Sequence, residues 1–287
     1  MTSHETVTMP PHKRLGGPER LFRVKMALDP HSGSQWGTTV SGPWMRGLDG
    51  MPSSAALGVL IDDTLGGAAS VQRPDGLWAV TTELSIDYPT PPTCDGQVVT
   101  SRGGIVSVNS HGALATGTVE DESAGTLAVM TLRSRYVPGV PEIPDGDRAA
   151  QPSDPSGPEV PHRESLLSLL NASISSDDRQ VRLRVPEDAE LTNASGVMHG
   201  GIALCASQLA ASRWLSAEEG MTLASTRITY LRQLEIDGGI EFVARVVHAG
   251  RTFRLVEVTA HGPTGKLCTT ATVAGYTEPG PPFNSRN

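Results

Sequence analysis

Apolar residues follow two different periods along this chain, and the same order of periods occurs twice. In the first part, a strand-like run at 22–28 and a Gly-rich loop precede a small-residue apolar segment at 53–71. Runs that alternate every second residue follow at 77–88, 97–110 and 113–137. The second part has a run at 180–185, a loop, an apolar segment at 200–215 and four alternating runs. Period-two alternation predicts β-strands, and a long segment that is apolar nearly all round predicts a buried helix.

Each part therefore predicts a strand, a loop, one buried helix and a meander of antiparallel strands. One helix packed on one antiparallel sheet is an α+β arrangement. Short matching segments favour a duplication, because residues 84–88 resemble 226–230 and residues 125–127 resemble 265–267. Identity between the two parts is low, so the repeat is a hypothesis at this point.

A segment rich in Pro, Asp, Gly and Ser at 139–161 separates the two parts. It has almost no large apolar side chains with which to offset the entropy of ordering, so it is predicted to be an exposed linker. We therefore divide the chain into a flexible tail (1–20), an N-terminal domain (21–138), this linker, a C-terminal domain (162–278) and a C-terminal tail (279–287).

The composition is that of an ordinary globular chain, with 38% hydrophobic and 19% charged residues in 287. The net charge of −8 argues against non-specific binding to nucleic acid or to anionic membranes. Three cysteines without metal-ligand spacing predict reduced thiols rather than a disulfide framework or a zinc site. No apolar run has transmembrane length and the first residues lack the apolar core of a signal peptide, so we expect a cytoplasmic protein.

The most specific local signal lies at the start of the second apolar segment, where His199 is followed by Gly200 and Gly201. Adjacent glycines at a helix start allow another group to approach the backbone closely. The unpaired N–H groups of that first turn then favour an anion, either bound or developing on a carbonyl oxygen. A plain glycine-rich helix start with a capping Ser or Asn would give the same pattern.

The first apolar segment carries two carboxylates, Asp62 and Asp63, with apolar residues on both sides. A solvated helix edge would also explain such a pair. In an otherwise buried helix, however, a carboxylate is costly unless it is paired or used chemically, so the pair is a candidate for function.

Together these residues resemble the PaaI-like acyl-CoA thioesterases, which have the hotdog fold. That family has an Asn six residues before His-Gly-Gly, an acid nine residues after the His, a Ser or Thr in the next strand and a later Gly-Arg-Thr-like turn. Asn193 has the first spacing, and Gly250, Arg251 and Thr252 match the turn. The resemblance implies a double hotdog, each half a long buried helix wrapped by a curled antiparallel sheet. It also implies thioester hydrolysis without a metal or bound cofactor.

The departures from the family pattern are complementary in the two halves. Nine residues after His199 stands Gln208, and seven before Tyr230 stands Leu223, so the second half lacks the acid and the hydroxyl. The first half has Asp62, Asp63 and, seven before Tyr88, Thr81, but begins its helix with Ser53 and Ser54 instead of His-Gly-Gly.

Because the family builds its site across two subunits, the resemblance implies one composite site in a fused pair. We expect the catalytic residues to be Asp62 or Asp63, Thr81, Asn193, His199 and Gly200. The opposite cleft, with Ser54, Gln208 and Leu223, is expected to be inactive.

Substrate contacts are expected from Gly201, Gly250, Arg251 and Thr252. Arg251 is equally consistent with a contact to the phosphates of CoA and with a solvated turn. The expected substrate is an acyl-CoA, and the expected assembly is a homo-oligomer, most simply a dimer of double hotdogs.

Two alternative functions stay open. The chain could bind acyl-CoA without turnover, or be a hotdog enoyl-CoA hydratase or dehydratase. The second ranks lower because the Asp-x-Asn-Pro-x-His loop of those enzymes is absent from the sequence.

Overall fold

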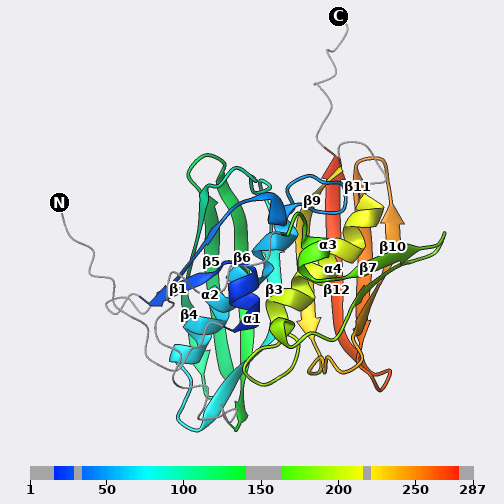
Figure 1. Cartoon of the computed structure of the whole chain (residues 1–287). Helices are drawn as coiled ribbons and strands as arrows, with labels where there is room; N and C mark the ends of the chain where they lie inside the picture. The colour runs from blue at the N-terminus through cyan, green and yellow to red at the C-terminus, as the bar shows by residue number, and fades with distance from the viewer. Residues whose placement is uncertain (1–15, 29–33, 140–162, 216–220, 278–287) are drawn as a thin grey trace, which may run out of the picture.

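The structure is a computed structural model, and it describes residues 16–28, 34–139, 163–215 and 221–277. In these residues twelve strands form one sheet, in the order β1-β2-β4-β5-β6-β3-β9-β12-β11-β10-β8-β7. Every neighbouring pair is antiparallel. The first six strands of the chain thus lie together, the last six lie together, and β3 and β9 join them (Figure 1).

Most strands coincide with the predicted runs, but two, at 35–40 and 173–176, do not. The first half contains β1 (Lys25–Leu28), β2 (Gln35–Val40), β3 (Leu77–Asp87), β4 (Val98–Asn109), β5 (Gly112–Asp121) and β6 (Gly125–Pro138). The second half contains β7 (Ser173–Ser176), β8 (Val181–Val185), β9 (Met221–Tyr230), β10 (Ile240–Ala249), β11 (Phe253–His261) and β12 (Leu267–Thr277).

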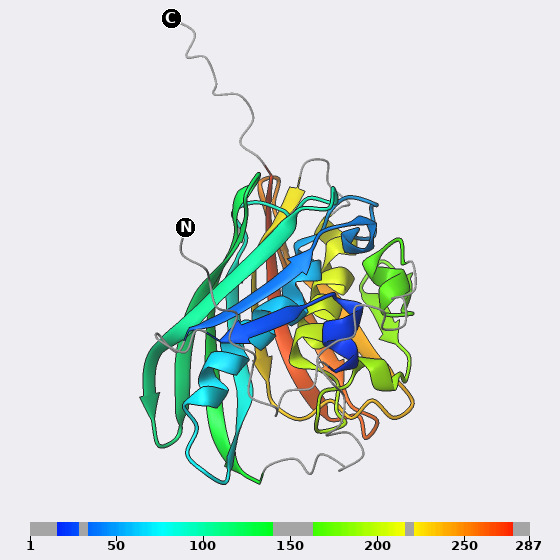
Figure 2. The same cartoon turned by 60° about the vertical axis from the view of Figure 1, so that its left-hand side comes forward.

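Two long helices, α2 (Gly58–Val71) and α4 (Gly200–Leu215), lie on one face of this sheet and are almost wholly buried (Figure 2). Each contacts mainly strands of its own half, and the two helices also pack against each other. A short 3-10 helix at Ser54–Leu57 leads into α2, so the predicted segment 53–71 is helical nearly throughout. The apolar residues of α2 and α4 form one continuous core with the inward side chains of the strands.

Shorter helices complete the fold: α1 (Gly17–Leu21), α3 (Leu166–Leu169) and 3-10 turns at Pro43–Met45 and Ala189–Leu191. Residues 17–20, which the sequence assigned to a flexible tail, belong to helix α1 in the structure, and Pro18 and Glu19 are buried there. The structure also has a strand, β2, where a Gly-rich loop was predicted. The inward residues of β2 are Gln35, Gly37 and Thr39, which reverses the usual apolar-inward pattern.

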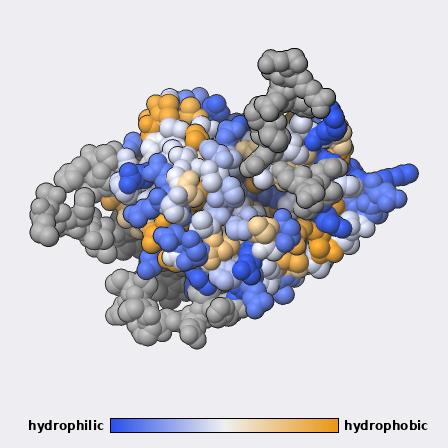
Figure 3. All heavy atoms as spheres, turned by 90° about the horizontal axis from the view of Figure 1, so that it is seen from above, coloured by the Kyte–Doolittle hydropathy of each residue, from blue (hydrophilic) through white to orange (hydrophobic). Residues whose placement is uncertain are grey.

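The predicted linker at 139–161 lies, apart from Gly139, outside the described residues. Within the described part of the chain, no helix is long and apolar enough to cross a membrane. Seen from above, the surface is largely polar, with apolar side chains in separate patches (Figure 3).

Candidate functional site

The N-terminus of α4 approaches α2 so closely that a side chain at either of its first two positions would press on neighbouring atoms. A Cβ atom on Gly200 would lie 2.6 Å from Oδ2 of Asp62. A Cβ atom on Gly201 would lie 2.5 Å from the carbonyl oxygen of Gly58 and from the Cα of Val59. The first glycine thus makes room for a carboxylate, and the second makes room for the backbone of the neighbouring helix.

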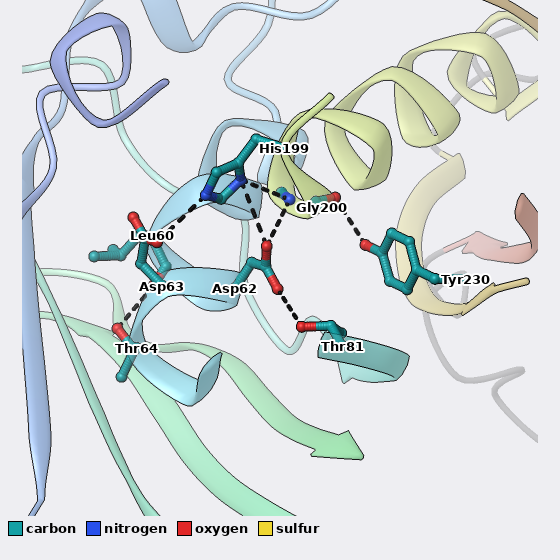
Figure 4. A network of polar contacts seen from close by, with 9 residues as sticks. Leu60, Asp62, Asp63, Thr64, Thr81, His199, Gly200 and Tyr230 are labelled. Atoms are coloured by element: carbon teal, nitrogen blue, oxygen red, sulfur yellow. Dashed lines mark hydrogen bonds and ion pairs between the residues drawn. The ribbon is translucent and has the colours of Figure 1, made fainter. Parts of the chain in front are cut away.

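Asp62 is held on both of its carboxylate oxygens by groups from the two halves of the chain. Thr81 of β3 donates its hydroxyl to Oδ1 at 3.0 Å, and the backbone N–H of Gly201 donates to Oδ2 at 3.0 Å (Figure 4). The carboxylate is buried. A carboxylate with two fixed donors has a defined orientation, and the N-terminus of α4 favours its negative charge.

His199 lies between the two adjacent carboxylates of α2. Its Nε2 is 3.3 Å from Oδ1 of Asp63 and its Nδ1 is 3.5 Å from Oδ2 of Asp62 (Figure 4). The ring is 7% exposed. Burial lowers the pKa of His199, but the hydrogen bond with Asp63 and the negative charges around the ring outweigh it and raise the pKa to about 9.

The charge on this ring determines its hydrogen bonds. Gly201 N–H lies 3.0 Å from His199 Nδ1 as well as from Asp62, and a neutral ring could accept it there. With carboxylates on both sides we assign the charged imidazolium, whose two nitrogens both donate. In that state the 3.0 Å contact between Gly201 N–H and Nδ1 joins two donors and is not a hydrogen bond, so the N–H of Gly201 donates to Asp62 instead.

Tyr230, the last residue of β9, fixes the other side of this helix start. Its hydroxyl donates to the carbonyl oxygen of Gly200 at 2.7 Å. Burial, followed by the charge of Asp62, raises the pKa of this phenol well above its ordinary value, so it stays a neutral donor.

Glu19 also reaches this site, and the sequence analysis missed it. It belongs to α1 and is buried, and one of its carboxylate oxygens, one of Asp63 and a ring nitrogen of His199 all lie within 4.8 Å of one another. Such a spacing is compatible with a metal ion, but the short distance between His199 and Asp63 is also that of an ordinary hydrogen bond. Glu19 follows Pro18 and belongs to no motif, so the sequence did not predict that it reaches this site.

Asn193 has a local role in the structure. Its side-chain oxygen accepts the N–H of Ser195 at 2.9 Å, in the turn that precedes His199. The contacts described for Asn193 are thus within its own loop, and they do not bring it to Asp62 or Thr81.

Gln208, the counterpart of the missing acid, lies in a different buried network. Its side-chain nitrogen donates to the hydroxyl of Tyr88 at 2.6 Å and to that of Thr226 at 3.0 Å. Leu223 supplies no hydroxyl, and Ser53 caps the short helix before α2 by accepting the N–H of Ala55. The described contacts of Gln208 therefore include no carboxylate, in contrast to the surroundings of His199.

The turn formed by Gly250, Arg251 and Thr252 lies far from this site. Thr252 accepts the N–H of Thr277, which pairs with Met221 at one end of β9, whereas Tyr230 at the other end contacts Gly200. At about 3.3 Å per residue, those two ends of β9 are roughly 30 Å apart. The structure thus brings together Asp62, Asp63, Thr81, His199, Gly200 and Gly201, and does not bring this turn to them.

Two surface hollows also lie away from the site. One is lined by residues 177–180 and Arg245, and the other includes Trp214 and Arg254 near the end of α4. Neither contains a member of the buried cluster. The candidate site is instead the closely packed contact between the start of α4 and the first half of α2.

Comparison with known proteins agrees with this architecture. A conserved protein of unknown function with a hot dog fold from Alicyclobacillus acidocaldarius superposes with a TM-score of 0.57 at 13% identity, over 92% of this chain and 98% of that one. The chain has a hotdog fold. The TesB protein of Mycobacterium avium subspecies paratuberculosis shares the fold, with a TM-score of 0.59 at 12% identity over 91% and 98% of the two chains.

A third similar structure is that of the 12:0-ACP thioesterase of Umbellularia californica, with a TM-score of 0.54 at 14% identity over 85% of this chain and 94% of that one. At the sequence level, the family described as the acyl-CoA thioesterase N-terminal domain matches residues 189–274. That range contains His199, α4, strands β9 to β11 and most of β12. No curated protein sequence matches the chain significantly.

Proposed function

We propose that this protein is an acyl-CoA thioesterase with one composite site, and that its chain is a double hotdog. The observation that carries the proposal is the double anchoring of Asp62. The first half supplies this carboxylate and the Thr81 hydroxyl, and the second half supplies the N–H of Gly201 and the imidazole of His199. The family match over residues 189–274 supports thioester chemistry rather than another use of the fold.

In the proposed reaction, Asp62 acts as general base. It takes a proton from a water molecule whose oxygen attacks the thioester carbonyl carbon. The C–S bond then breaks, and the CoA thiolate leaves and regains a proton, while the acyl group becomes a carboxylic acid. Thr81 keeps the carboxylate oriented, and general bases of this kind accelerate reactions by about 10²–10⁴-fold.

The start of α4 would stabilise the negative charge that develops on the thioester oxygen. Gly201 N–H donates to Asp62, so we assign the oxygen to the N–H of Gly200, whose residue is only partly buried. The helix dipole and the imidazolium of His199 add positive potential at the same place.

The rival hydratase function draws support from the close pair of His199 and Asp63. A hydratase needs a His nitrogen that faces the substrate. Here Nε2 faces Asp63 and Nδ1 faces Asp62. The two nitrogens are thus engaged by the protein, which favours the carboxylate as the base.

The proposal is tested by incubating the full chain with a panel of saturated acyl-CoAs of increasing length. Free CoA thiol is measured, and an enoyl-CoA is followed in parallel for loss of its double bond. Release of thiol from saturated substrates supports the thioesterase. Tight binding without thiol release would support a binding protein, and loss of the double bond without thiol release would support the hydratase.

A further inference from the structure

Glu19 is placed in the site by a short helix that is fixed at several points. Gly17 of α1 packs directly against the backbone of Glu190, so that no Cβ atom would fit there. Arg20 forms an ion pair with the side chain of Glu190, and the N–H of Val24 donates to the carbonyl oxygen of Glu19 at 2.7 Å. These contacts fix the backbone on both sides of Glu19.

The carboxylate of Glu19 meets a cluster that comes from three distant parts of the chain. Glu19 lies on α1, Asp63 lies on α2, and His199 directly precedes α4. One ligand atom from each lies within 4.8 Å of the other two, and the exposures of the residues are 8%, 4% and 7%. The surroundings of the imidazole thus include a third carboxylate besides Asp62 and Asp63.

The carboxylates around His199 affect the charge state of its ring. Ion pairs interact more strongly in a buried site than in water, so each carboxylate near the ring stabilises its positive form. Among the residues that the structure describes, the titratable groups that face His199 are Asp62 and Asp63 from α2 and Glu19 from α1; Tyr230 from β9 is a neutral phenol nearby. Glu19 is the member of this set that comes from outside the two long helices.

We propose that Glu19 is a positioning residue of the site, which from α1 holds the His199 ring in its charged form against Asp63. Its catalytic consequence rests on the proposed thioesterase function, because the charged ring would keep Asp62 ionised and would attract the developing oxyanion. Its structural consequence, the state of the His199 ring, does not depend on that function.

The direct test is the titration of His199 by NMR in the full-length protein, with the signal assigned by its loss in His199→Gln. Glu19→Gln keeps the shape of the side chain and removes its charge, so the pKa of His199 is expected to fall from about 9. Glu19→Asp keeps the charge on a shorter side chain and should restore part of the difference. Glu122→Gln removes an equal charge at an exposed position between β5 and β6 and should leave the titration near that of the wild type.

Activity gives a second readout once thiol release has been established. Glu19→Gln should lower kcat on the order of 10- to 100-fold with little change in KM, and should move the alkaline limb of the pH–rate profile to lower pH. An unchanged His199 titration in a folded Glu19→Gln protein would overturn the proposal. So would a stoichiometric metal ion in the purified protein whose removal by chelator abolishes the wild-type titration. If the wild type released no thiol but the titration moved as stated, the proposed function would fail and the role of Glu19 would stand.

Discussion

Replacing either of the two adjacent glycines at the start of α4 with Ala should have different effects. At Gly200 the substitution should lower kcat, and at Gly201 it should lower the stability of the fold. In Gly200→Ala, the new Cβ atom meets the end of a side chain, Oδ2 of Asp62, at 2.6 Å. The carboxylate can move, but it must retreat by roughly 0.5–1 Å to reach ordinary van der Waals separation. Its 3.0 Å hydrogen bond from Gly201 N–H then reaches or exceeds the hydrogen-bond limit.

The expected result for Gly200→Ala is a kcat lower by about 100-fold, which is about 2.7 kcal/mol in the activation free energy. Stability should change little, because the better helix propensity of Ala offsets much of the lost hydrogen bond, at about 1 kcal/mol each. In Gly201→Ala the Cβ atom meets the Gly58 carbonyl oxygen and the Val59 Cα at 2.5 Å. Backbone atoms cannot step aside, so the helices must separate, at a cost of about 3 kcal/mol or more.

Both variants are measured by steady-state thiol release and by urea unfolding. A wild-type rate in Gly200→Ala would refute the claim that the position of Asp62 against α4 controls turnover. A Gly201→Ala protein as stable as the wild type would refute the claim that this glycine is required by helix contact.

Three further predictions concern pH, the second network and assembly. Since the folded-state pKa of His199 is raised to about 9 from 6.5, its stabilising contribution should be complete below about pH 6.5. It should be lost as the pH rises through 9, by on the order of 3 kcal/mol, and His199→Gln should remove this slope in urea unfolding. Gln208→Ala should destabilise the chain by about 1–3 kcal/mol, because it leaves the buried hydroxyls of Tyr88 and Thr226 without this donor. It should leave kcat of the folded protein near that of the wild type; a large loss of kcat would instead give Gln208 a part in the reaction. The fused chains should associate, so light scattering should give a mass above 30.2 kDa, and a monomer mass at all concentrations would reject that expectation.

Much of the fold follows from hydrophobic periodicity. The helices at 58–71 and 200–215 were predictable because they are apolar nearly all round, and most strands because they alternate. The strand β2 was not, because its inward positions hold Gln35, Gly37 and Thr39. Its large apolar residues, Trp36 and Val40, face outward, and periodicity alone cannot recognise such a reversal.

The site was predictable as far as its residues carry local signals. His199 and the adjacent glycines form a motif, and two carboxylates in an apolar helix are conspicuous. The choice between them required coordinates: Thr81 and Gly201 contact Asp62, and Asp63 faces His199.

Whether other residues lie at the site could not be predicted, because it depends on how distant segments pack together. Asn193 has the family spacing, but its side chain closes its own turn. Arg251 has the family turn, but the pairing of β9 with β12 places that turn at the opposite end of the strand from Tyr230. Glu19 has no motif, and only the packing of α1 brings it to His199.

The central claim is that Asp62, held by both halves, is the base of a single composite site. The most direct measurement is kcat for thiol release in Asp62→Asn, which keeps the shape of the side chain and removes the base. It is compared with Asp237→Asn, which makes the same change at an exposed position. We predict a fall in kcat of at least about 100-fold for Asp62→Asn, with KM within a few-fold of the wild type, and no change for Asp237→Asn. A folded Asp62→Asn protein that turns over at the wild-type rate would contradict the account.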